Sequence, residues 1–187
     1  MLTLAAHWAI SMRLMGLASG LLSVNLVLQG QFQAAMLALL WAVIFDQIKG
    51  WITRNLSVRA EEQKLFVAKM DPPVDLVIFA AGPGIFLLTY AEFSPWFFPG
   101  GLAIVITGVL RLAYSGAFGV AENGSLAGLS IHFTPLVVTG LFLLDGPLSH
   151  NAFAAVLYAV IVTSAILQVA PLRMDKLTGP WVFMVNA

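Results

Sequence analysis

The sequence has no cysteine and few charged residues, and these two deficits exclude many kinds of protein. Without cysteine, the chain can form no disulfide, thiolate zinc site or cysteine nucleophile. Charged residues make up 10% of the 187 positions, against about 25% in a typical soluble domain. Because 60% of the residues are hydrophobic, a soluble globule of this size would lack the polar groups to cover its surface. We therefore exclude an ordinary soluble enzyme, a disordered protein and a nucleic-acid-binding protein.

Six apolar stretches are long enough, or nearly so, to cross a hydrocarbon core of about 30 Å. They predict an all-α polytopic membrane protein with six transmembrane helices. Residues 1–187 are expected to form a single integral-membrane domain, because the longest polar stretch runs only from about residue 49 to 73. A cleavable signal peptide is not expected, because the first ten residues contain no Lys or Arg. The predicted spans are residues 9–28, 32–48, 74–90, 96–115, 130–144 and 152–172.

With six spans, all nine basic residues fall on one side of the membrane. That side holds both termini, the loop between the second and third spans, and the loop between the fourth and fifth. The loops on the other side contain no Lys or Arg. The positive-inside rule then places the N- and C-termini in the cytoplasm. The nine residues are Arg13, Lys49, Arg54, Arg59, Lys64, Lys69, Arg111, Arg173 and Lys176.

An acidic residue ends the second apolar run. Asp46 follows the segment AMLALLWAVIF and should lie near the cytoplasmic end of that span. Ionisable residues within spans are costly and usually face a bundle interior or a polar cavity. Gly50 and Arg54 follow at i+4 and i+8, so a continuing helix would place them on the same face as Asp46.

Two more acidic residues precede the third apolar run. Asp71 and Asp75 are four residues apart, so they share one face of a helix. Pro72 and Pro73 suit the first helical turn, where no intrahelical N–H bond is lost. The spacing therefore predicts a helix that starts here, with Asp71 at or beside its N-cap.

Two interpretations of these carboxylates are open from spacing alone. In the first, two helices joined on the cytoplasmic side point three carboxylates at one another and bind a divalent metal that grips a diphosphate. In the second, Asp71 only caps a helix, and Asp46 pairs with Lys49 or Arg54.

At these residues the chain resembles the CDP-alcohol phosphatidyltransferase family. The family pattern is Asp-x2-Asp-Gly-x2-Ala-Arg-x8-Gly-x3-Asp-x3-Asp across the second and third of six spans. The two halves here read DQIKGWITR and FVAKMDPPVDLVIFAAGP, and the second also resembles the phosphatidylserine synthase branch. The matching residues are Asp46, Gly50, Arg54, Asp71 and Asp75, and in that branch Leu76, Val77, Phe79 and Pro83.

The chain departs from the family pattern in three residues and in spacing. Lys49 stands where the family has its second Asp, Thr53 replaces the Ala, and Val67 replaces the second Gly. Four extra residues lie between Arg54 and Val67. Lys49 could replace one metal ion electrostatically, as a point charge against phosphate, or it could mark an inactive relative.

The resemblance implies a role for each matching residue. Asp46, Asp71 and Asp75 would bind a divalent metal, Mg²⁺ or Mn²⁺, and Asp75 would also act as the general base. Gly50, Arg54 and, in this chain, Lys49 would line the CDP site.

The activity implied by the resemblance is phospholipid biosynthesis. The protein would transfer a phosphatidyl group from a CDP-linked lipid such as CDP-diacylglycerol to a small alcohol, with serine as the candidate acceptor, and release CMP. It would act as a homodimer in the bacterial inner membrane, with its active site facing the cytoplasm. The alternative is an inactive homologue that binds lipid or a partner membrane enzyme. A transporter is disfavoured, because the carboxylates cluster at one membrane face rather than at the midplane.

Three other polar residues have competing interpretations. Arg111 ends the run GLAIVITGVL and could bind a phosphate or the acceptor, or it could reach the headgroups as Arg does near a span end. His132 would lie near the mouth of the cavity into which the three carboxylates point. There it could contact the acceptor or a phosphate, or it could be structural. Arg13 is expected at the cytoplasmic interface, with a lateral lipid gate as its functional alternative.

Overall fold

The computed structural model describes residues 4–54, 61–118, 126–127, 129–142, 148–170 and 173–174. In this part of the chain nearly every residue is helical, and two strands of two residues each form one antiparallel pair. The elements are α1 (Leu4–Leu28), α2 (Phe32–Arg54), α3 (Glu61–Asp75), the π-helix η2 (Leu76–Ala81), α4 (Gly82–Tyr90), the 3-10 turn η3 (Pro95–Phe97), α5 (Phe98–Phe118), β1 (Leu126–Ala127), α6 (Phe133–Phe142), α7 (His150–Val169) and β2 (Arg173–Met174).

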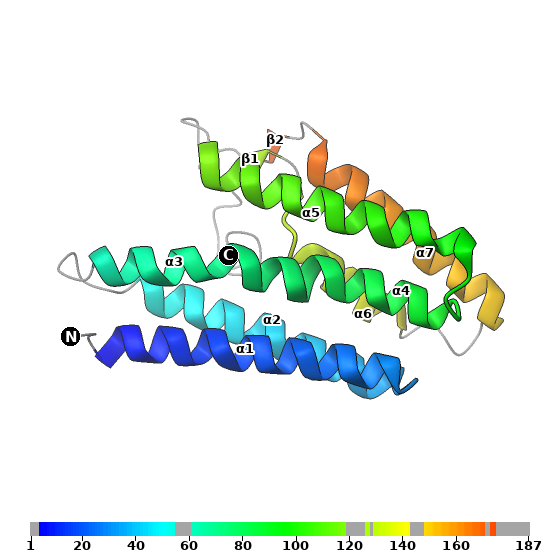
Figure 1. Ribbon diagram of the computed structural model, residues 1–187, viewed down its shortest axis with the longest axis horizontal. Helices are drawn as coiled ribbons and strands as arrows, with labels where there is room; N and C mark the ends of the chain where they lie inside the picture. The colour runs from blue at the N-terminus through cyan, green and yellow to red at the C-terminus, as the bar shows by residue number, and fades with distance from the viewer. Residues whose placement is uncertain are drawn as a thin grey trace.

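The helices form an elongated bundle (Figure 1). α1 and α2 pair along one side, while α5 and α7 pair along the other. α3, η2 and α4 follow one another as a nearly continuous rod between these pairs, and α6 packs against α2 and α7. The start of α1, the end of α2, the start of α3 and the end of α5 all lie at one end of the bundle, on the left in Figure 1.

Five helical segments are long and apolar enough to cross a membrane. This confirms the prediction of an all-α polytopic membrane protein. α6 is also apolar but has only 10 residues, so the sixth span stays a prediction, as does the cytoplasmic placement of the termini. The five segments are His7–Leu28, Phe32–Thr53, Ala68–Tyr90, Pro95–Ala117 and His150–Val169.

The third span begins earlier than the sequence predicted. α3 starts at Glu61, so Pro72 and Pro73 lie inside a helix rather than in its first turn. The expectation that Asp71 stands at or beside an N-cap was therefore wrong. The apolar run alone marked the start too late, because the first turns of α3 are polar and only the later ones enter the apolar bundle.

Two glycines let α1 and α5 approach the π-helix closely. A Cβ atom on Gly20 of α1 would lie 2.6 Å from Cγ1 of Ile78, and one on Gly108 of α5 would lie 2.6 Å from Cβ of Ala80. Small residues allow such close backbone approach between membrane helices. Because η2 follows Asp75 directly, this packing also fixes where α1 lies relative to the carboxylates.

Candidate functional site

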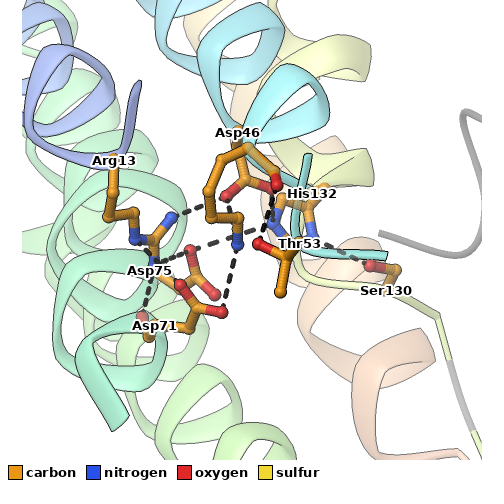
Figure 2. Close-up of polar contacts among 8 residues, drawn as sticks. Arg13, Asp46, Thr53, Asp71, Asp75, Ser130 and His132 are labelled. Atoms are coloured by element: carbon orange, nitrogen blue, oxygen red, sulfur yellow. Dashed lines mark hydrogen bonds and ion pairs between the residues drawn. The ribbon is translucent and has the colours of Figure 1, made fainter. Parts of the chain in front are cut away.

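Three carboxylates from two helices converge inside the bundle (Figure 2). Asp46 comes from α2, and Asp71 and Asp75 come from the last turns of α3. Asp46 and Asp75 are buried, while the side chain of Asp71 is 29% exposed. The site therefore opens on the Asp71 side and is closed around the other two.

The guanidinium of Arg13 on α1 contacts all three carboxylates from one side of the cluster (Figure 2). Its Nη1 lies 2.6 Å from Oδ1 of Asp46, and its Nη2 lies 2.6 Å from Oδ1 of Asp75. Nη2 also donates to the backbone carbonyl of Asp71 at 2.6 Å, and Nε lies 3.1 Å from Oδ1 of the same residue. One guanidinium thus links α1 to α2 and α3 through short, charge-assisted contacts.

The burial of Arg13 was not expected from the sequence. The residue is 2% exposed, because its side chain points into the bundle towards the three carboxylates. The sequence does carry a signal for this role, because Arg13 is an ionisable residue inside an apolar run, and such residues usually find partners in the bundle. The sequence alone does not show which residues Arg13 contacts, because its partners lie 33 to 62 residues away along the chain.

Lys49 adds a second permanent cation to the cluster. Its Nζ lies 3.1 Å from Oδ1 of Asp46 and 3.1 Å from Oδ2 of Asp71. The residue is buried. The two open interpretations of the carboxylates are therefore not exclusive, because Asp46 both joins the other carboxylates and pairs with Lys49.

His132 closes the cluster on the side away from Asp71. Its Nε2 lies 3.1 Å from Oδ2 of Asp46 and 3.9 Å from Oδ1 of Asp75. The other ring nitrogen, Nδ1, lies 3.1 Å from Oγ of Ser130, and the ring packs 4.5 Å from that of Phe79. His132 therefore contacts the carboxylates directly.

The residues present fit a divalent metal ion. Asp46, Asp75 and His132 each offer a ligand atom, and these atoms lie within 4.8 Å of one another. Within the described part of the chain, Nε2 of His132 is buried and makes no hydrogen bond. Carboxylate oxygens and a neutral imidazole nitrogen are both common metal ligands.

The remaining predicted residues flank this cluster. Gly50 faces open space, since a Cβ atom there would meet nothing within 4 Å. Arg54 ends α2, but its side chain lies outside the described part of the structure. Arg111 is half-buried on α5, and its Nε donates to the carbonyl of Leu129 at 3.4 Å, just before the turn that carries His132.

The comparison with known proteins points to the same chemistry as the carboxylate spacing. The chain is similar to archaetidylserine synthase from Methanothermobacter thermautotrophicus. The two share 29% identity over 164 residues, which cover 86% of this chain and 66% of that protein, just under two thirds of its length. No family model matches the chain. The similarity to a synthase of this kind supports a relationship to the CDP-alcohol phosphatidyltransferases.

Proposed function

We propose that this chain is an integral-membrane phosphotransferase of phospholipid biosynthesis. It transfers the phosphatidyl-type group of a CDP-linked lipid to a small alcohol and releases CMP. The observation that carries this proposal is the convergence of Asp46, Asp71 and Asp75 inside an apolar bundle. The similarity to archaetidylserine synthase over 86% of the chain supports it independently.

In this proposal the carboxylates and His132 hold and orient the reactants. A divalent ion, Mg²⁺ or Mn²⁺, bound among Asp46, Asp71, Asp75 and His132 would neutralise diphosphate charge and make CMP a better leaving group. Asp75 accepts the proton of the acceptor hydroxyl. The hydroxyl oxygen attacks the lipid-side phosphorus, and the bond from that phosphorus to the CMP oxygen breaks.

The CDP moiety is proposed to bind along the last turns of α2. Gly50 leaves the helix backbone accessible there, since nothing lies within 4 Å of its Cβ position. Lys49 and Arg54 supply positive charge on the same stretch of helix. Arg111, whose Nε donates to the carbonyl of Leu129, is the candidate for binding the acceptor or a phosphate. His132 was the other candidate from the sequence, and in this proposal it binds the metal instead.

The finer assignments follow from the chain's charges and its relative. Serine is the proposed acceptor, because the relative is named as an archaetidylserine synthase. The nine basic residues favour a site that faces the cytoplasm, and the proposed location is the bacterial inner membrane. A homodimer is the proposed assembly, from the family resemblance.

A second candidate function is an inactive homologue that binds lipid or a partner enzyme. The observation that favours it is the pairing of all three carboxylates with cations of the chain itself, Arg13 and Lys49. Such a protein would bind a CDP-linked lipid without turnover.

Measurement of CMP release distinguishes the two functions. Purified protein is incubated with Mn²⁺ or Mg²⁺, either CDP-diacylglycerol or its archaeal ether-lipid counterpart, and serine or another small alcohol. The enzyme hypothesis predicts CMP release that depends on both the lipid and the alcohol. The exposed variant Lys69→Met should release CMP as the wild type does, whereas Asp75→Asn should not. Lipid binding without CMP release for every alcohol would establish the inactive homologue instead.

A further inference from the structure

The carboxylate cluster has two unlike sides. Both oxygens of Asp71 face cations of the chain, since Oδ1 lies 3.1 Å from Nε of Arg13 and Oδ2 lies 3.1 Å from Nζ of Lys49. On the opposite side, Oδ2 of Asp46 faces Nε2 of His132 at 3.1 Å. That nitrogen is buried without a hydrogen bond among the described residues. One side is thus occupied by permanent cations, and the other presents an imidazole nitrogen that contacts a carboxylate oxygen without a hydrogen bond within the described structure.

The charges of the cluster do not balance. Three carboxylates face only two permanent cations, Arg13 and Lys49, so charge balance in this buried site needs one further positive charge on the side of His132. Buried charge is costly unless it is paired. A cation at the side of His132 would provide that pairing.

We propose that Asp46, Asp75 and His132 form a site for one divalent ion with a nitrogen ligand, and that Arg13 competes with this ion for the two carboxylates. This inference rests on the proposed function, in which the ion would face the diphosphate. It removes Asp71 from the ligands named in the proposed function, because both oxygens of Asp71 face Arg13 and Lys49. An imidazole ligand favours Mn²⁺ or another transition metal over Mg²⁺ and Ca²⁺, which prefer oxygen.

The position of His132 suits a ligand. Ser130 contacts Nδ1 at 3.1 Å, which leaves Nε2 directed at the carboxylates. The turn itself is held to α7, because the backbone N–H of Leu129 donates to the carbonyl of Leu167 at 2.9 Å and Gln168 donates to Oγ1 of Thr134 at 3.1 Å. Hydrogen bonds of this kind orient metal ligands from behind.

The contacts of Arg13 explain the competition. Its two Nη atoms lie 2.6 Å from Oδ1 of Asp46 and 2.6 Å from Oδ1 of Asp75. A divalent ion bound to those two carboxylates must share their negative charge with the guanidinium a few ångströms away. Removing the charge of Arg13 should therefore tighten metal binding by at least about tenfold, since charges at such distances interact strongly in a buried site.

Direct titration with Mn²⁺ tests the proposal without using activity. The full chain is purified in detergent, and free Mn²⁺ is measured by electron paramagnetic resonance. We expect one bound ion per chain in the wild type. Binding should be at least about tenfold weaker in His132→Phe, as for the loss of a supporting group or ligand. Binding should be tighter in Arg13→Met. The control His150→Phe changes a histidine at the other end of the bundle and should bind as the wild type does.

A second comparison keeps the test decisive if Arg13→Met does not fold. Asp46→Asn should lose Mn²⁺ binding, whereas Asp71→Asn should retain it. Equal loss in these two variants, unchanged binding in His132→Phe, or no bound Mn²⁺ in the wild type would overturn the proposal. If the protein releases CMP but His132→Phe does not change Mn²⁺ binding, only this inference is refuted. If Mn²⁺ binds as expected but no CDP-lipid yields CMP, only the proposed function is refuted.

Discussion

Replacing Arg13 with methionine should destabilise the protein more than any other single change of a basic residue. The guanidinium is 2% exposed and lies 2.6 Å from the carboxylates of both Asp46 and Asp75. At an effective dielectric constant of about 20, each contact is worth about 6 kcal/mol of gross Coulomb energy, and the cost of burying the ions offsets much of this. Removing Arg13 leaves the buried Asp75 without its permanent cation, so Arg13→Met should lower the free energy of unfolding by about 3–5 kcal/mol.

A double-mutant cycle separates this effect from lost packing. Unfolding in mixed detergent and SDS micelles is followed by circular dichroism for Arg13→Met, for Asp75→Asn and for the double variant. The loss of unfolding free energy in the double variant should be smaller than the sum of the losses in the two single variants, by about 0.5–3 kcal/mol. The reason is that Arg13→Met leaves the Asp75 carboxylate unpaired, and Asp75→Asn removes that charge. Lys69→Met, at an exposed position of α3, is the control and should change stability by less than about 0.5 kcal/mol. Additive losses, or an Arg13→Met variant as stable as this control, would refute the reasoning.

Three further predictions concern catalysis and packing. Asp75→Asn should lower kcat for CMP release by about 10²–10⁴-fold, and an unchanged kcat would exclude it as the base. Gly20→Ala should cost about 1–3 kcal/mol in the same unfolding assay, because its Cβ would lie 2.6 Å from Cγ1 of Ile78. The control Gly116→Ala, whose Cβ would have nothing within 4 Å, should cost nothing. Equal stability of the two variants would contradict this close packing. Gln168→Leu should cost about 0.6–1.7 kcal/mol through its lost bond to Thr134, and a stability equal to that of the wild type would show this bond to be dispensable.

The sequence predicted the membrane fold well because the signal is local. Continuous apolar runs identified the five long helices and the shorter α6, since a span must satisfy its backbone internally and cover itself with apolar side chains. The same local signal failed at α3. Its polar first turns are helical but not apolar, so the predicted span began at residue 74, whereas the apolar segment begins at Ala68 and the helix at Glu61.

The candidate site was only partly predictable, because its contacts join distant segments. The spacing of Asp46, Asp71 and Asp75 predicted that the carboxylates meet, and the structure brings them together. It could not predict that Arg13 reaches all three, because that depends on how α1 packs on η2 near Gly20. For the same reason His132 was expected at the cavity mouth, whereas the structure places it against Asp46.

The central claim is that this membrane bundle transfers a phosphatidyl-type group to an alcohol. The most direct test incubates the purified protein with Mn²⁺, a CDP-linked lipid and isotopically labelled serine, then measures both CMP and the label in extracted lipid. We predict equal amounts of CMP and labelled lipid from the wild type, and neither from Asp75→Asn. A folded wild-type protein that binds the CDP-linked lipid but forms neither product, with serine or any other small alcohol, would contradict the account.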